Sequence, residues 1–167
     1  MSKLFRTTLW ILSGIGLIAF LVQTLSTFLI SPLMGLLSLL IAAVLVALVI
    51  YLLQRSPMWA RPARLWALLA FLWGGGVAVS LALISSGPVM QLAIGTGWVD
   101  AMMSWSGAYP EEISKATGVI FVLMSFRQLN RPWHGWIVGA VVGLGFEACE
   151  NILYGAMGAT MHPDSDI

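Results

Sequence analysis

Long apolar runs alternate along this chain with short stretches that contain polar residues, glycine or proline. A run of about 20 residues is long enough for a helix to cross the hydrocarbon core of a bilayer. The pattern therefore predicts an all-α, polytopic transmembrane helical bundle, with residues 1–167 forming a single integral membrane domain. The expected spans cover residues 9–30, 33–53, 65–85, 110–126 and 136–158.

Residues 89–108 form a further apolar stretch, in which Asp100 is the one charged residue. Apolar side chains recur at about every fourth position from Met90 to Trp105, which is typical of an amphipathic helix lying in the membrane interface. Ser86-Gly87-Pro88 is expected to end the preceding span. This interpretation predicts about five spanning helices and one interfacial helix.

The basic residues favour the interfacial interpretation. If residues 89–108 do not cross, seven of the eight Lys and Arg residues lie on one side, as the positive-inside rule requires. The N-terminus is then cytoplasmic and the C-terminus extracytoplasmic, in a plasma or bacterial inner membrane. The first apolar run is too long for a signal peptide and no small-residue cleavage site follows it, so we expect an uncleaved anchor. The seven residues are Lys3, Arg6, Arg55, Arg61, Arg64, Arg127 and Arg131.

Composition agrees with a membrane location. Hydrophobic residues make up 59% of the chain and charged residues 9%, whereas a soluble domain carries about 25% charged residues. The expected partner is the lipid bilayer. The formal net charge of +1 indicates no nucleic acid partner, and the oligomeric state is not indicated. The single cysteine, Cys149, excludes an internal disulfide and is expected to be a small packing residue.

Two pairs of glutamates stand out against this apolar background. Glu147 and Glu150 lie inside the last expected span, where a charged residue costs roughly 2.5–3.5 kcal/mol on insertion scales, so a functional role is the first hypothesis. Glu111 and Glu112 begin the preceding span. If the two spans form a hairpin, Glu112 and Glu150 are each 14 residues from the loop. At 1.5 Å of rise per residue both lie about 21 Å from the same edge of the membrane core, and are therefore level.

Helical faces add to this picture. Gly135, Gly139 and Gly143 form a small-residue stripe that would let another helix approach closely. The same stripe, continued toward the C-terminus, contains Glu147, Glu150, Asn151 and Tyr154. In the preceding span, Lys115 lies three and four residues after Glu112 and Glu111, so its ammonium can reach either carboxylate.

Structural explanations compete with functional ones. Pro110 and two acids suit the first turn of a helix, which would account for Glu111 and Glu112 alone. Lys115 could simply neutralise a neighbour, and Asn151 and Tyr154 could bond adjacent helices. Capping does not explain Glu147 and Glu150. Crowded carboxylates in a low-dielectric site do not all ionise together, which provides a general base and a general acid, or a proton relay in a carrier. Spacing does not separate these two functions.

A family resemblance does separate them. Glu111-Glu112-Ile113-Ser114-Lys115 is an EExxK motif, and Phe146 to Glu150 is an FxxxE motif within GLGFEACENILY. Together they resemble the PrsW-type intramembrane proteases, which are glutamic-type peptidases related to the CAAX prenyl endopeptidases. The resemblance covers residues 109–155. It implies a hydrolase that cleaves membrane-anchored proteins, such as anti-sigma factors, near the extracytoplasmic face.

The resemblance also implies roles for individual residues. By position, Glu111 and Glu112 would supply the catalytic base, and Glu150 with Asn151 the second motif. Lys115 and Tyr154 would be accessory. Glu147 would be accessory too, because it stands where the family usually has a small residue.

One family feature has no counterpart in these 167 residues, namely a histidine on a later transmembrane helix. His134 is expected at the cytoplasmic end, about 24 Å of helix rise from Glu150, and His162 in an exposed tail. A truncated gene product, a short member and an inactive remnant all remain open. So does a non-catalytic membrane module or proton-coupled carrier that uses the same acids. No cofactor is expected, although four acids could hold an ion.

Overall fold

The computed structural model describes residues 3–62 and 64–161, and all regular elements in these ranges are helical. This confirms the predicted all-α membrane bundle. The elements are α1 (Lys3–Ile30), α2 (Pro32–Arg55), α3 (Arg64–Leu72), the π-helical segment η1 (Trp73–Ala78), α4 (Val79–Gly95), the short 3-10 segment η2 (Val99–Ala101), α5 (Met102–Ser125) and α6 (His134–Met161).

Within the described residues, four helical segments are long and apolar enough to cross a membrane. They are Lys3–Ile30, Pro32–Arg55, Arg64–Gly95 and His134–Met161. The third combines α3, η1 and α4 in one continuous helix. These segments contain the expected spans 9–30, 33–53, 65–85 and 136–158. The expected span 110–126 lies almost wholly within α5, which is not among the four by composition.

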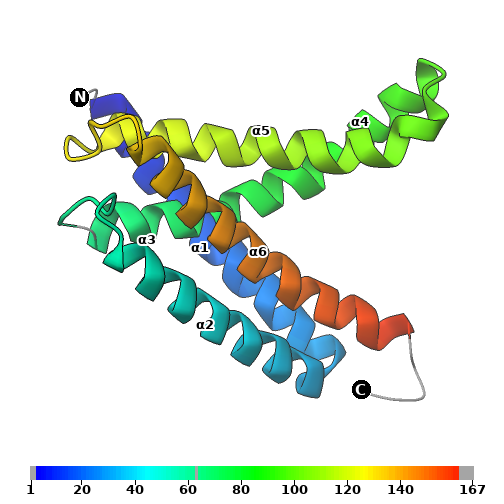
Figure 1. The fold of residues 1–167 in the computed structure, drawn as a ribbon. Coiled ribbons are helices and arrows are strands. Elements are labelled where there is room, and N and C mark those ends of the chain that lie inside the picture. Colours follow the sequence, from blue (N-terminus) through cyan, green and yellow to red (C-terminus); the bar gives the residue numbers. More distant parts are fainter. Residues whose placement is uncertain (1–2, 63, 162–167) are drawn as a thin grey trace.

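The expectation of a separate interfacial helix over residues 89–108 is wrong. The third span does not end at Ser86-Gly87-Pro88 but continues to Gly95. Proline removes one backbone hydrogen bond, whereas unwinding a helix in lipid would leave several backbone groups without partners. The chain then reverses at Gly97, whose φ of 81° lies in the left-handed region that glycine adopts readily. Residues 89–108 are therefore the tip of an α4–α5 hairpin (Figure 1).

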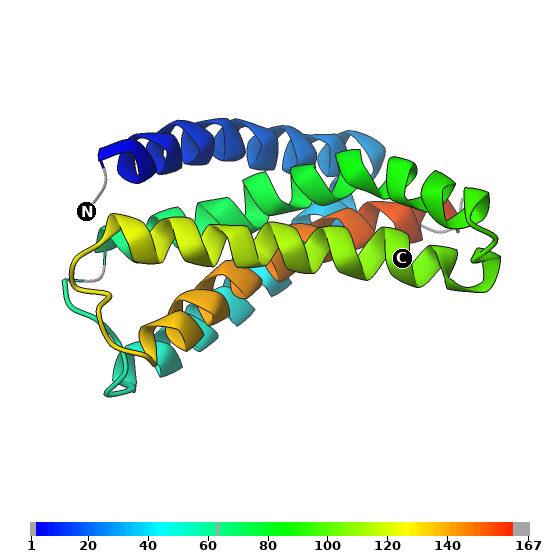
Figure 2. The same cartoon turned by 90° about the horizontal axis from the view of Figure 1, so that it is seen from above.

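Helix α6 contacts α1, α2, α3, η1 and α5, and in Figure 2 it crosses α5 at an angle. The closest approach is at the glycine triplet in η1. A Cβ atom on Gly74 would overlap the carbonyl oxygen of Val142 in α6, and one on Gly76 would overlap Gly16 in α1. Small residues therefore bring three backbones into contact here, as they do at many membrane helix crossings.

The glycine stripe predicted on α6 does not make this close contact. Cβ atoms on Gly135 and Gly139 would meet side chains of α5 only at 4.0 and 3.9 Å, and one on Gly143 would meet nothing within 4 Å. Gly145 takes that role instead, because its Cβ would overlap the carbonyl oxygen of Phe71. The rotation of α6 about its axis turns the expected stripe partly away from its neighbours.

The two ends of the bundle differ in charge and in how the helices are arranged. The N-terminal end of α1, the loop after α2 and the loop after α5 lie together at one end, to which Gln128 contributes a 3.3 Å hydrogen bond to the carbonyl of Pro62 (Figure 1). This is the basic end, carrying the seven residues Lys3, Arg6, Arg55, Arg61, Arg64, Arg127 and Arg131. At the opposite end the α4–α5 hairpin diverges from α1, α2 and the C-terminal part of α6.

Candidate functional site

The first acidic motif lies in the middle of helix α5, away from both of its ends. The helix begins at Met102, so Glu111 and Glu112 lie more than two turns from its N-terminus, and Pro110 is inside it. The helix dipole acts mainly on the first turn. The explanation of these acids as helix-start residues is therefore wrong, and their place in an apolar bundle needs another reason.

Lys115 pairs with both acids of its motif. Its Nζ atom is 2.5 Å from Oε1 of Glu112 and 3.9 Å from Oε2 of Glu111. The two carboxylates differ in exposure, with the side chain of Glu112 71% exposed and that of Glu111 30% exposed. Lys115 itself is 18% exposed. Glu111 is therefore the acid on the protein side of α5, and Glu112 lies at the outer edge of the pair.

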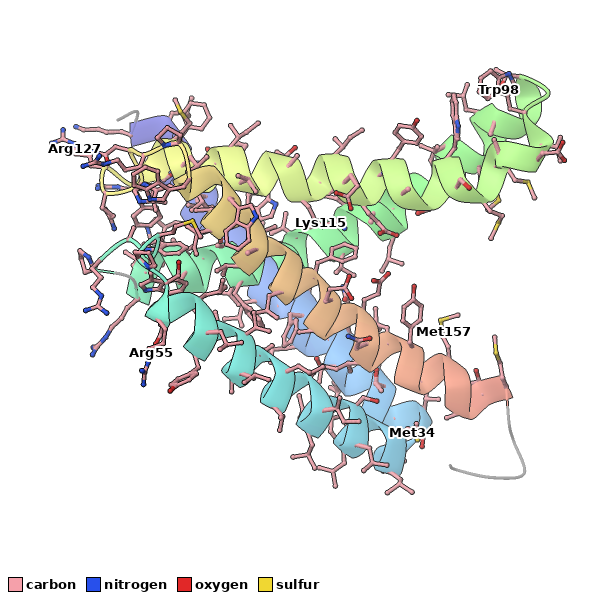
Figure 3. All side chains as sticks on the ribbon, viewed as in Figure 1. Met34, Arg55, Trp98, Lys115, Arg127 and Met157 are labelled. Atoms are coloured by element: carbon pink, nitrogen blue, oxygen red, sulfur yellow. The ribbon has the colours of Figure 1, made fainter. Side chains whose placement is uncertain are left out.

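Helix α6 presents the second motif. The hydroxyl of Tyr154 donates a 3.0 Å hydrogen bond to Oε1 of Glu150, which is half-buried. One turn before Glu150, the ring of Phe146 is buried, and the ammonium of Lys115 lies 4.3 Å from its centroid. Figure 3 labels Lys115 on the side of α5 that faces α6. Glu147 and Asn151 are exposed.

The two motifs meet across the α5–α6 crossing. The carboxylate of Glu150 acts electrostatically on Glu111, together with Lys115 and Glu112. The contact between the ammonium of Lys115 and the ring of Phe146 joins the two helices at this place. The structure thus brings together Glu111, Lys115, Phe146, Glu150 and Tyr154. The sequence predicts that Glu112 matches the depth of Glu150, whereas Glu111 is the less exposed acid of the pair.

Trp73 in η1 sets the position of α5. Its indole N–H donates a 3.0 Å hydrogen bond to the carbonyl of Ser114, and its ring stacks on Phe121 at 5.2 Å. A Cβ atom on Gly118 would overlap the same indole. These contacts determine the face that α5 turns toward α6, and hence the side from which Glu111 emerges. Trp73 is absent from the residues predicted for the site, although a tryptophan beside three glycines in an apolar run is a usable signal.

Two consecutive side-chain hydrogen bonds begin at Cys149, the residue before Glu150. Cys149 donates its thiol hydrogen to Oε1 of Gln23 at 2.9 Å, and Nε2 of Gln23 donates to the hydroxyl of Ser80 at 3.2 Å. These hydrogen bonds join α6, α1 and α4. Cys149 is buried, as expected of a packing residue, but it also takes part in this bonding. Gln23 was missed, and a lone amide within the first apolar run was the signal for it.

Comparison with known families now adds to the geometry. A family model described as PrsW family intramembrane metalloprotease matches residues 62–167. The matched range is more than half of the chain and contains both acidic helices. The chain belongs to the PrsW family. No curated protein and no solved structure matches it.

The family is described as a metalloprotease, so the side chains that could bind a metal ion near the acids matter here. No group of three or more His, Cys, Asp or Glu side chains within the described residues is arranged to hold an ion. His134 lies at the basic end, where its Nδ1 accepts a 3.0 Å hydrogen bond from the backbone N–H of Arg131. Cys149 is directed to Gln23, and the ammonium of Lys115 takes the place beside the α5 carboxylates that a cation would take. The described side chains therefore form no metal-binding group, and His162 lies outside the described residues.

Proposed function

We propose that this PrsW-family chain is an intramembrane endopeptidase of the glutamic type, with Glu111 and Glu150 as its catalytic pair. The observation that carries the proposal is the contact of Lys115, which pairs with Glu111 on α5, with the ring of Phe146, one turn before Glu150 on α6. Each family motif supplies one member of the pair. A role in packing alone does not require two carboxylates to share an apolar site.

The chemistry follows from this pairing. Two carboxylates in a low-dielectric site favour a state in which one is ionised and the other protonated. The ionised member of the pair accepts a proton from water as that water attacks the scissile carbonyl. The protonated member donates a proton to the leaving amine.

Neighbouring side chains prepare the pair. The ammonium of Lys115 lies beside Glu111, and the hydroxyl of Tyr154 orients Glu150 by donating to Oε1. Glu112 and Asn151 lie at the exposed edge of the site, where Glu112 shares the ammonium of Lys115 and Asn151 can donate to the substrate carbonyl.

The substrate is a membrane-anchored protein of the class to which anti-sigma factors belong. Lys115 lies on the part of α5 that diverges from the C-terminal part of α6 (Figure 3). That part extends away from the basic end, which the positive-inside rule assigns to the cytoplasm of a bacterial inner membrane. Cleavage near the extracytoplasmic face is the expected outcome, with five crossings if α5 spans.

The test is co-expression of the chain with membrane-anchored reporter proteins that carry candidate cleavage segments. Loss of a general acid or base lowers rates by about 10²–10⁴-fold, so Glu111→Gln and Glu150→Gln are expected to abolish detectable cleavage. Asp100→Asn is the matched control, because Asp100 is an exposed acid at the α4–α5 turn, outside the site. Cleavage by both variants at the parent rate would refute the proposal, and Glu150-dependent proton uptake into vesicles without cleavage would favour a carrier.

A further inference from the structure

A pair of open pockets lies at the basic end, far from the acids. The first has a volume of about 940 Å³, and its lining includes Lys3, Arg6 and Arg127. The second has a volume of about 730 Å³, and its lining includes Arg61 and Arg64. Figure 3 labels Arg127 at this end of the molecule. Five cationic side chains therefore surround two neighbouring hollows.

The two pockets are neighbours. Leu65, Phe126 and Gln128 line both of them, so the pockets share a wall. The side chain of Gln128 is held in this wall by its 3.3 Å hydrogen bond to the carbonyl of Pro62. We call this feature the basic vestibule. Cationic groups that share one vestibule suit an anionic ligand with more than one oxygen-rich group.

The charges of the vestibule have no acidic partner within it. No acidic residue is among the described residues that line either pocket. Among residues 3–62 and 64–161, the ion pairs are those that Lys115 makes with Glu111 and Glu112. Unpaired cations in a pocket form a positive potential that attracts anions.

The surroundings of the vestibule identify the source of the anion. Trp10 and Ile11 belong to the same lining as Lys3 and Arg6, and their side chains are 46% and 59% exposed on the apolar face of α1. A tryptophan beside basic residues at the end of an apolar helix is typical of the headgroup level of a membrane. An acyl chain could follow the exposed apolar side of α1 while its phosphate lies among the arginines.

We propose that the basic vestibule binds the phosphate headgroup of an anionic phospholipid. Basic pockets between membrane helices bind lipid phosphates through charge and hydrogen bonds. Because two pockets adjoin, a diphosphatidylglycerol, with two phosphates, is expected to bind more tightly than a lipid with one. The positive-inside rule alone accounts for basic residues at this end but requires no pocket, so the two explanations differ in what they predict for individual arginines.

The test is native mass spectrometry of the full chain in detergent, after removal of co-purified lipid. Phosphatidylglycerol, diphosphatidylglycerol and zwitterionic phosphatidylcholine are added in separate titrations. The expected result is retention of both anionic lipids, with the diphosphatidyl lipid bound more tightly. The double variant Arg6→Gln/Arg127→Gln is expected to raise the dissociation constant about 30-fold, as for two basic residues at a membrane surface.

The matched control is Arg55→Gln/Arg131→Gln, which removes two charges from the same end. Arg55 lies over the Tyr51 ring and Arg131 over the Trp133 ring, and neither lines a pocket. Equal weakening by the two double variants would overturn the proposal, as would equal retention of phosphatidylcholine. Displacement of the lipid by glycerol phosphate at the same concentration would also overturn it, because the site would then serve a soluble phosphate. Size-exclusion profiles that match the parent show that the variants are folded.

Discussion

Lys115 of α5 holds its ammonium 4.3 Å from the centre of the Phe146 ring of α6. Phe146 is 2% exposed, so the ring and the ammonium meet in a largely desolvated place, where a cation–π contact contributes about 2 kcal/mol. The same ammonium pairs with the two acids of its own motif. Lys115 is therefore the residue that physically joins the two family motifs.

Replacement of Lys115 tests this junction. Lys115→Met keeps the length of the side chain but removes the charge from Glu111, and cleavage of a reporter is expected to fall about tenfold or more, because a hydrogen bond to a charged group is worth about 1.5–3 kcal/mol. Lys115→Arg restores the charge and is expected to recover part of the activity. Lys3→Met, a change of the same kind at the basic end, is the control. Full activity of Lys115→Met would show that the junction is not needed.

Two glycines on α6 allow a sharp test of packing. Gly145→Ala is expected to lower the free energy of unfolding by about 1–3 kcal/mol, because the new methyl group would overlap the carbonyl of Phe71 in a crossing that is already filled. Gly143→Ala, two residues earlier, meets nothing within 4 Å and is expected to be neutral or slightly stabilising. Unfolding in detergent, followed by circular dichroism, measures both. A larger loss for Gly143→Ala would contradict the observed rotation of α6.

The bonding of Cys149 to Gln23 is open to a double-mutant cycle. The variants Gln23→Leu and Cys149→Ala, alone and combined, are expected to show a coupling free energy of about 0.6 kcal/mol, with an upper limit near 1.7 kcal/mol. Gln91→Leu, at an exposed glutamine of α4, is the control and should not couple to Cys149→Ala. A coupling of zero in the first cycle would exclude the hydrogen bond as a contributor to stability.

The number of crossings is testable through the single cysteine. In a Cys149→Ala background, Asp100→Cys reports on the α4–α5 turn and Asn130→Cys on the loop between α5 and α6; both positions are exposed. If α5 spans, a membrane-impermeant maleimide applied to intact cells labels position 100 and not position 130. Labelling of both positions would mean that α5 does not cross.

Much of the architecture was predictable because it depends on local properties. Each long apolar run became a helix, since a chain in lipid must satisfy its backbone hydrogen bonds within the segment. The meeting of the EExxK motif with the second motif was also accessible. A short loop between two helices makes them antiparallel neighbours, and equal distances from that loop place residues at a similar depth.

The wrong predictions have a common cause. Each concerns a feature that depends on contacts with neighbouring helices. Pro88 was expected to end a helix because proline is a helix breaker in water, but in this bundle continuation to Gly95 is less costly. The glycine stripe from Gly135 to Gly143 was predicted from spacing alone, whereas the close contact is at Gly145. Spacing defines a face of a helix, but only packing decides which neighbour that face meets.

By itself the sequence determined the membrane environment, the helices and the presence of two acidic motifs on adjacent segments, because hydropathy and motif spacing are properties of the chain. The tertiary structure decided which acid faces the partner helix. Glu111 and Glu112 are neighbours in sequence but differ by about 100° around a helix. The contacts of Trp73 with Ser114 and Gly118 select the rotation of α5 that leaves Glu111 less exposed than Glu112. That rotation depends on side chains far apart in the chain, and therefore only the folded bundle could reveal it.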